Sequence, residues 1–568
     1  MLKETIVNLL KDVVSPTKEE IEKLLEVPPN PDLGDIAFPC FILAKQFKKN
    51  PTVIAAEIAE QLNNNQKSEN INVQSQGAYI NFFFKNEVWS EKLLNSILKK
   101  DFTKMEIGNN ERIIIDMSSP NIAKPFGIGH LRSTMIGNAL YHIYKTAGYD
   151  PVRVNHLGDW GTQFGKQITA YKRWGDPQKM EENAIHECLQ LYVKFHEEAE
   201  NDPELEKEAR LWFKKLEDGD EEATELWKFF IELSLKEFKF MYDKLGVEFD
   251  YYLGESFYND KMSPVVLELK EKGLLEESEG AMVVRLDEAE MPPCLILKSD
   301  GTTIYPTRDL ATAIYRHEEM QGSKILYVVG AEQQLHFKQV FAVLDKMGKA
   351  WSSDCEHIPF GLMKYEGKKM STRRGKVIFL EKVLEEAVTK ATEIINEKSP
   401  ELSNKNEVAE AIGIGSVIFN DLKNNRIQEV DFSLEDALNF EGETGPYVQY
   451  TYARTQSLLE KGAWDEAWIN ELTLTDGKHL NDQASWGLTK ELMNFPNVIQ
   501  HALKKNEPSV LARYVLEIAK KFNRYYNQVR INVEDENEKK TKLILTYATG
   551  KILKESIHCL GLKSPSKI

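Results

Sequence analysis

Cysteine is scarce in this sequence of 568 residues: there are five, and the closest two, Cys294 and Cys355, lie 61 positions apart. Zinc knuckles need closely spaced cysteine pairs, so no structural zinc is expected, and the scattered cysteines do not suggest a disulfide framework. An uninterrupted apolar run of ~18 residues, the length of a membrane-spanning helix, is also absent. Residues 1–14 mix charged and apolar residues at helical spacing, which is typical of an amphipathic helix and not of a signal peptide. We therefore expect a soluble, cytoplasmic protein that has no membrane partner.

An excess of positive charge is absent too. Lysine and arginine number 72 against 89 aspartates and glutamates, so the formal net charge is −17, which argues against a nucleic-acid partner. The acidic excess is local, however, because residues 181–225 hold sixteen acidic and five basic residues, a balance of −11. Residues 368–376 and 502–531 are basic, the latter with seven basic against two acidic residues. The total charge therefore does not exclude RNA.

Short apolar segments alternate with helical patterns in the middle of the chain. Strands are predicted over 111–117, 151–158 and 323–330, and helices over 130–147 and 334–347. This alternation is typical of an α/β fold with a Rossmann-type parallel sheet. About 165 residues separate the second strand from the third, so a long insertion divides the sheet.

The patterns predict three domains. Residues 1–105 form a small α+β domain, and residues 106–380 form the parallel-sheet domain, whose insertion occupies about 170–300. Residues 381–568 are predicted to be entirely helical.

Two segments carry chemistry. SSPNIAKPFGIGHLRST follows the first strand and enters a helix, and its glycines allow a flat purine or a phosphate to approach the backbone at the helix N-terminus. KKMSTRRGK (368–376) can close over a polyphosphate and neutralise the charge of departing pyrophosphate. Taken singly, the first is more often a glycine-rich turn with a packing histidine, and the second a solvated basic loop.

Together these segments resemble the two signatures of class I aminoacyl-tRNA synthetases. Further segments resemble arginyl-tRNA synthetases in the family's order, namely NHLGDWGTQFG, YPTRDLATAIYR, GAEQQLHF, FEGETGPYVQYTYAR and FNRYYNQVRI. The resemblance implies an enzyme that activates L-arginine with ATP, releases pyrophosphate and transfers the arginyl group to the terminal adenosine of tRNA(Arg). It also implies Mg²⁺ bound with ATP, an additional tRNA-binding domain over 1–105 and an anticodon-binding domain over 381–568. We expect a monomer.

The resemblance assigns roles to individual residues. Catalysis is expected from His130, Lys369, Ser371 and Lys124. ATP binding is expected from Gly127, Gly129, His130, Glu332, Lys369, Met370 and Ser371. Arginine binding is expected from Asp116, Asn121, Tyr305, Asp309 and Gln333.

Asp309 is the best candidate for a bidentate partner of the substrate guanidinium, because that planar fork of donors needs carboxylates around it. Tyr305, four residues earlier, is expected to wall the pocket. The alternative is that Asp309 is an acid at a helix N-terminus, paired with Arg308 or Arg316.

Two departures from the family pattern stand out. Gly127 occupies the place of the usual first histidine, and Thr372 that of the second loop lysine. We expect Lys124 or Arg373 to supply the missing charge. The departures also leave open a relative that keeps the fold as an RNA-binding or regulatory module. A class I synthetase for another amino acid is the nearest rival enzyme, and the polar, acidic set Asp116, Asp309 and Gln333, which suits a cation, stands against it.

RNA contacts are expected in two places. Aromatic residues interleaved with basic ones can stack on anticodon bases and neutralise phosphates; the candidates are Tyr447, Tyr450, Arg524, Tyr526 and Arg530. In the first domain, Tyr79 and Asn81 resemble family residues that touch the tRNA elbow, whereas Phe82 and Phe84 are better explained as core residues.

Overall fold

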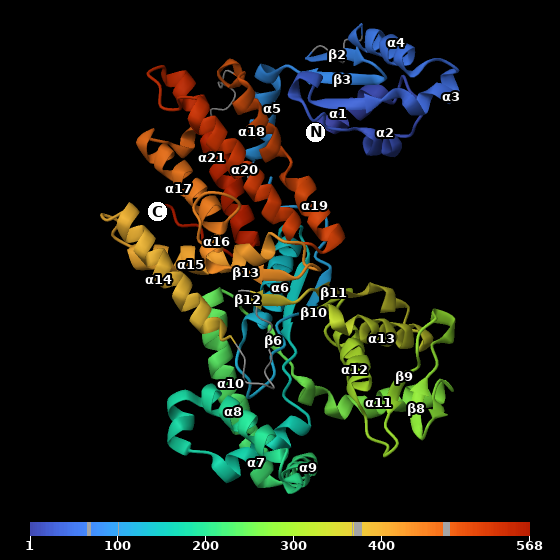
Figure 1. Cartoon of the computed structure of the whole chain (residues 1–568). Helices are drawn as coiled ribbons and strands as arrows, with labels where there is room; N and C mark the ends of the chain where they lie inside the picture. The colour runs from blue at the N-terminus through green and yellow to red at the C-terminus, as the bar shows by residue number, and fades with distance from the viewer. Residues whose placement is uncertain (65–69, 100–101, 366, 368–377, 470–476) are drawn as a thin grey trace. The chain divides into compact units, whose positions relative to one another are not determined.

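A computed structural model of the chain describes residues 1–64, 70–99, 102–365, 367, 378–469 and 477–568. The chain divides into two units (Figure 1). The first comprises residues 1–99, 461–493 and 524–548, and the second comprises residues 100–460, 494–523 and 549–568. Two long helices contribute to both units, α20 (Ser509–Gln528) and α21 (Glu536–Cys559).

The first unit is built around a three-stranded antiparallel sheet. Its strand order is β1 (Ile36–Pro39), β3 (Tyr79–Phe84), β2 (Ile71–Gln76). Side chains alternate between the faces of a strand, and Ile80, Phe82 and Phe84 are buried from β3. The accompanying helices are α1 (Leu2–Leu10), α2 (Lys18–Leu24), α4 (Pro51–Asn63) and α5 (Asn86–Ile97).

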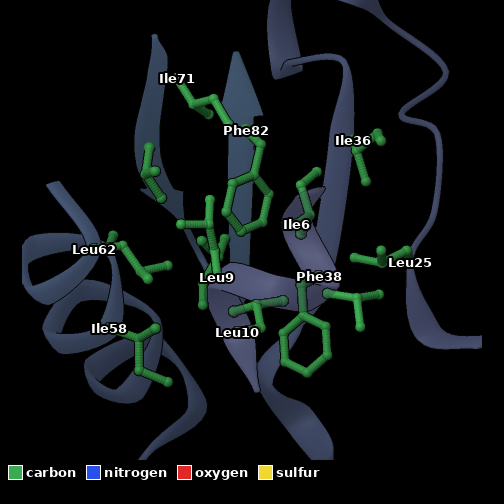
Figure 2. Packing of buried hydrophobic residues seen from close by; sticks show 14 of the residues in the cluster. Ile6, Leu9, Leu10, Leu25, Ile36, Phe38, Ile58, Leu62, Ile71 and Phe82 are labelled. Carbon is green, nitrogen blue, oxygen red and sulfur yellow. The ribbon is translucent and has the colours of Figure 1, made fainter. Parts of the chain in front are cut away.

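Phe82 lies in the hydrophobic core of this unit, as Figure 2 shows. Aliphatic side chains surround it from two helices: Ile6, Leu9 and Leu10 from α1, and Ile58 and Leu62 from α4. The spacing of these residues places them on one face of each helix. Trp486 of α18 (Gln483–Met493) belongs to the same core, so a segment from late in the chain completes it.

The second unit contains the predicted parallel sheet. Its strand order is β11 (Cys355–Phe360), β10 (Lys324–Gly330), β4 (Arg112–Asp116), β5 (Asp150–Asn155), β6 (Tyr251–Tyr252), and every pairing is parallel. Ile114 of β4 is level with Ile325 of β10 and Val152 of β5. Because the chain proceeds from β4 to β5 on one side while β10 flanks β4 on the other, the strand order reverses at β4. Ligands of open α/β sheets bind beyond the carboxyl ends of strands at such a point.

Helices connect the strands of this sheet. α6 (Ile128–Thr146) joins β4 to β5, and α13 (Gln334–Lys346) joins β10 to β11. Four helices lie between β5 and β6: α7 (Thr162–Trp174), α8 (Pro177–Ala199), α9 (Pro203–Glu217) and α10 (Glu221–Leu245). They contain the acidic segment and bury the aromatic side chains of Phe195, Trp212 and Phe230.

The remainder of the insertion leads back to the sheet. Its elements are α11 (Met262–Glu271), an antiparallel sheet of β7 (Glu276–Ser278), β8 (Ala281–Val284) and β9 (Cys294–Leu297), and α12 (Tyr305–Glu318). α12 directly precedes β10 in the sequence. As the helix that leads into this strand, α12 can contribute side chains to a site at the parallel sheet.

The segment beyond residue 381 contains a strand, so the prediction of an entirely helical segment is wrong there. β13 (Val430–Phe432) pairs in parallel with β12 (Met363–Tyr365), and its residues alternate between buried and exposed. Three residues are too few for a period of two to be recognised in the sequence. The neighbouring helices are α14 (Leu380–Lys398), α15 (Lys405–Leu422), α16 (Leu434–Ala437), α17 (Gly445–Lys461) and α19 (Phe495–Lys505).

A buried ion pair links α6 to α15. Nε of Arg132 lies 2.8 Å from Oδ1 of Asp421, and both side chains are almost completely buried. The guanidinium also donates to the carbonyl oxygens of Gly361 at 2.7 Å and Gln428 at 2.8 Å, which flank the β12–β13 pair. One side chain thus joins the first helix of the parallel sheet to the helical segment.

Replacing Arg132 by methionine leaves the Asp421 carboxyl buried without its counter-ion. We expect Arg132→Met to lower the free energy of unfolding of the second unit by about 3–5 kcal/mol. The double variant Arg132→Met/Asp421→Leu removes both charges and should recover most of that loss. Hydrogen exchange of peptides from α6 and α15 under increasing urea measures both effects. A double variant as unstable as the single one would contradict this account.

Candidate active site

The loop between β4 and α6 forms the floor of the candidate site. α6 starts at Ile128, and the Gly127 backbone N–H donates to Nδ1 of His130 at 3.1 Å. Gly129 is exposed, and a Cβ placed on it would have no atom within 4 Å. Open space therefore lies over the first turn of the helix, although the N–H groups of Ile128 and His130 already donate there, to the carbonyls of Ile378 at 3.2 Å and Gly127 at 2.9 Å.

His130 is neutral at pH 7. Burial of the ring, together with the positive charge of Lys124, lowers the pKa of His130 from 6.5 to about 4. Because Nδ1 accepts the Gly127 N–H, the single proton of the neutral ring lies on Nε2. His130 can therefore donate a hydrogen bond from Nε2 without carrying a charge.

Asp116, the last residue of β4, is paired within the protein. Its Oδ2 lies 2.7 Å from Nη1 of Arg316 on α12, and Oδ1 accepts a hydrogen bond from the Ser119 hydroxyl at 3.0 Å. Burial by itself lowers the pKa of Arg316, but the Asp116 carboxylate together with Tyr258 and Tyr327 outweighs it, and the pKa of the guanidinium is raised above its usual value. The predicted role of Asp116 in binding the substrate calls for a free carboxylate. In the structure this carboxylate is already paired with Arg316.

Asp309 and Tyr305 lie one turn apart on α12, so they share one face of that helix. Oδ2 of Asp309 is 2.5 Å from Nε2 of His336 on α13. The alternative pairing of Asp309 with Arg308 or Arg316 is wrong, because Arg316 binds Asp116 and Arg308 lies 3.6 Å from Glu255. Among the described residues, no arginine forms an ion pair with Asp309. One of its carboxylate oxygens therefore stays available for the guanidinium of a substrate.

Glu255 is a member of this site that sequence reasoning missed. It follows β6, and its carboxyl, 16% exposed, faces Arg308. Burial, with the nearby charges of Asp309 and Asp159, raises the pKa of Glu255 to about 7, although Arg308 opposes the shift. Glu255 follows a strand of the parallel sheet, which is where ligands bind in such folds. The sequence does not show this, because β6 is recognised as part of the sheet only from the topology.

The remaining predicted residues lie at the same edge of the sheet. Glu332 and Gln333 are exposed directly after β10. Asn121 forms a parallel bridge to Gly158, which follows β5. The Lys124 ammonium lies 5.4 Å from the ring centre of Tyr192 on α8. Four predicted residues, Lys369, Met370, Ser371 and Arg373, lie outside the described residues.

The side chains of the first unit that are predicted to contact RNA differ in their exposure to solvent. Tyr79 packs edge-on against the exposed ring of Phe41, whereas Asn81 is only 4% exposed and offers little surface to a base. Arg524, Tyr526 and Arg530 are exposed. Phe82 and Phe84 are core residues, as expected.

In the second unit, Tyr447 and Tyr450 line a cavity of about 410 Å³. Lys398, Phe440 and Arg454 also line it, so aromatic surfaces and positive charges lie together. The Asn523 amide donates to the Tyr447 hydroxyl at 2.9 Å and orients that ring. Such a combination suits an unpaired base with its phosphate.

Neither a metal cluster nor a membrane helix is found in the parts of the chain that the structure describes. No three histidine, cysteine, aspartate or glutamate side chains are grouped to hold a metal ion there. None of the helices in these parts has the length and apolar character needed to cross a bilayer.

The raised pKa of Glu255 predicts a pH-dependent cost to folding. The unfolded carboxyl ionises near pH 4.5 and the folded one near 7, so ionisation opposes folding fully above pH 7 and not at all below 4.5. We expect Glu255→Gln to raise stability by up to about 3 kcal/mol at pH 8 and to leave it unchanged at pH 4.5. Thermal unfolding at both pH values measures this, with Glu319→Gln, an exposed carboxyl beyond the end of α12, as the control. An equal effect at both pH values would contradict the assignment.

Comparison with known proteins identifies similar sequences over the whole chain. Family models match residues 1–84 (arginyl tRNA synthetase N-terminal domain), 92–434 (tRNA synthetases class I (R), catalytic domain) and 448–568 (DALR anticodon binding domain). Arginine–tRNA ligase 2 of Bacillus anthracis is 52% identical over 554 residues, 97% of each chain. Arginine–tRNA ligase of Enterococcus faecalis is 50% identical over 570 residues, 100% of each chain.

Solved structures share the fold. Arginyl-tRNA synthetase from Thermus thermophilus superposes with a TM-score of 0.83 at 24% identity, over 100% of this chain and 99% of that one. The Plasmodium falciparum enzyme gives 0.79 at 24% identity, over 100% and 98%.

Proposed function

The chain belongs to the class I arginyl-tRNA synthetases, and from this premise we propose how its own residues carry the reaction. It is an arginine–tRNA ligase. In the family's two steps, the arginine carboxylate attacks the α-phosphorus of ATP, giving arginyl-adenylate and pyrophosphate, and the terminal ribose of the tRNA then attacks the activated carbonyl. No side chain must act as a nucleophile, so catalysis consists of positioning and charge stabilisation.

We propose that the substrate guanidinium binds between Glu255 and Asp309, beside Tyr305. The observation that supports this most directly is the raised pKa of Glu255, to which Asp309 contributes: two carboxyls share one partly buried region. A guanidinium placed between them would pair with the Asp309 oxygen that His336 does not bind and would add to the charge of Arg308, which lies 3.6 Å from Glu255; a neutral side chain would supply neither charge nor donors. Asn121 and Gln333, at the ends of the neighbouring strands, are proposed to hold the α-amino end. Asp116, which is paired with Arg316, is proposed to contribute to the binding of the same α-amino end.

We propose that ATP lies over the first turn of α6. Gly129 leaves open space over the first turn, the Gly127 N–H orients His130, neutral His130 donates from Nε2, and Glu332 after β10 is proposed to bind the ribose. Mg²⁺ is proposed to enter with ATP and to be held by its phosphates and water. Roles of Lys369, Met370 and Ser371 on the phosphates stay predictions from the sequence.

RNA contacts are proposed on separate surfaces. The cavity lined by Tyr447 and Tyr450 is a candidate for an anticodon base, and Arg524, Tyr526 and Arg530 are candidates for further bases and phosphates. Tyr79 with the neighbouring Phe41 is a candidate for the tRNA elbow. We propose that the enzyme acts in the cytoplasm, where arginine, ATP and tRNA meet, and as a monomer.

Asp309→Ala tests the arginine pocket. We expect the KM for arginine to rise by about a hundredfold or more, because the remaining pocket leaves the guanidinium partly unpaired, while the KM for ATP changes little. Arginine-dependent ATP–pyrophosphate exchange in the presence of tRNA(Arg) measures both constants. Equal changes in the two constants would exclude Asp309 as the guanidinium partner. Absence of exchange in the wild-type protein would refute the activity itself.

Lys124→Ala and Arg373→Ala test which residue replaces the missing loop lysine. We expect Lys124→Ala to lower the kcat of exchange by about a hundredfold, since its charge would be needed in the transition state. Arg373→Ala serves as the matched removal of a positive charge and should cost less. An unimpaired Lys124→Ala enzyme would exclude Lys124 from the role.

A further inference from the structure

Helix α10 of the acidic insertion contacts the loop between β4 and α6 at two points. Ser234, fully buried, accepts a hydrogen bond from the Ala123 backbone N–H at 2.9 Å, while its hydroxyl donates to the Phe230 carbonyl within the helix. Two turns later, the hydroxyl of Tyr242 lies 2.8 Å from that of Ser118. Ser234 and Tyr242 are eight residues apart and therefore face the loop from the same side of the helix.

This loop has an unfavourable backbone. Three of its residues other than glycine have left-handed φ values: Ser118 at 72°, Ser119 at 50° and Ala123 at 59°. Residues with a Cβ adopt this region at a cost, and they keep it only where the surrounding structure imposes it. The two contacts from α10 fall on Ser118 and Ala123, the first and the last of the three.

Other contacts hold the start, the middle and the end of the loop, where the Phe126 carbonyl accepts the Leu380 N–H at 3.1 Å and the Ile128 N–H donates to the Ile378 carbonyl at 3.2 Å. The Ser118 N–H donates to the Ser133 hydroxyl at 2.9 Å, and the Ile122 N–H donates to the Gly158 carbonyl at 3.1 Å, both within the parallel-sheet region. Ala123 receives its backbone contact from Ser234 of the insertion. The next residue, Lys124, lies over the ring of Tyr192 on α8, also in the insertion.

Tyr242 is itself held rigidly. Its oxygen accepts a hydrogen bond from the Asn155 amide at 2.9 Å, at the end of β5, and the side chain is 1% exposed. The phenol therefore joins the carboxyl end of β5 to the loop that follows β4. Burial raises the pKa of Tyr242, so the hydroxyl stays protonated and able to donate.

We propose that Ser234 and Tyr242 are positioning residues for adenylate formation. Through them, α10 keeps the loop in the conformation that places Asn121 and Lys124 at the substrates. The inference rests on the proposed function of those two residues. It assigns a role in the reaction to buried hydroxyls of the insertion and none to its exposed acidic groups.

Ser234→Ala and Tyr242→Phe each remove one hydroxyl with little change in volume. In exchange assays at saturating tRNA(Arg), we expect each to lower kcat about tenfold, with KM for arginine and ATP changed less than about threefold, because a displaced loop weakens contacts made in the transition state. The matched control is Thr169→Val on α7: Thr169 is buried and donates to the Gly165 carbonyl in the same way, but among the described residues its hydroxyl does not bond to the loop. It should keep wild-type kcat.

A rescue separates positioning from general stability. Glycine adopts a left-handed backbone without the Cβ penalty, so Ala123→Gly makes the loop less dependent on support. We expect Ser234→Ala/Ala123→Gly to regain at least about threefold in kcat over Ser234→Ala.

Several outcomes overturn the proposal. Wild-type kcat in folded Ser234→Ala and Tyr242→Phe would do so, and so would an equal loss in Thr169→Val or a failure of the rescue. If Ser234→Ala does not fold, Tyr242→Phe alone decides. A wild-type enzyme without arginine-dependent exchange would instead refute the proposed function.

Discussion

The buried ion pair between Asp116 and Arg316 connects the two halves of the proposed active site. Asp116 ends the strand from which the nucleotide loop departs, and Arg316 lies on α12, the helix that carries Tyr305 and Asp309. Both side chains are almost fully buried, so moving one away would leave the other as an uncompensated charge. The helix proposed to bind arginine is therefore held against the strand that begins the proposed ATP site, although 200 residues separate the two partners in sequence.

Charge in this site is arranged so that the substrate completes it. Glu255 and Asp309 bring two carboxyls into a partly buried region, where the charge of Asp309 helps to raise the pKa of Glu255 although Arg308 lies 3.6 Å away. His130, in contrast, is kept neutral by burial and by the nearby charge of Lys124, so it adds no charge to the site. The proposed arginine end of the site is thus acidic and Lys124 lies at the proposed phosphate end, which matches the opposite charges of the two substrates.

The acidic insertion has two chemically different faces. Its acidic residues account for most of the net charge of the chain, and its aromatic residues form a buried core with Phe195, Trp212 and Phe230. Ser234 and Tyr242, which contact the loop between β4 and α6, are neither acidic nor exposed. Net charge therefore describes the solvent-facing side of the insertion and says little about its contribution to the site or about RNA binding elsewhere.

The sequence by itself determined the parallel sheet and the place of the loop between β4 and α6. β4 and β10 are short strands with continuous apolar runs because both faces of the sheet are covered, whereas β5 alternates valines with Arg153 and Asn155. The family motifs also named Asp309, His130 and Lys124. Only the tertiary structure decided the partners: Arg316 for Asp116, His336 for Asp309, Glu255 as a second carboxyl, β13 as a partner of β12, and α10 as support of the loop. Periodicity records which side of an element is buried, whereas each of these contacts joins segments far apart in the chain, and its geometry arises only when the elements pack.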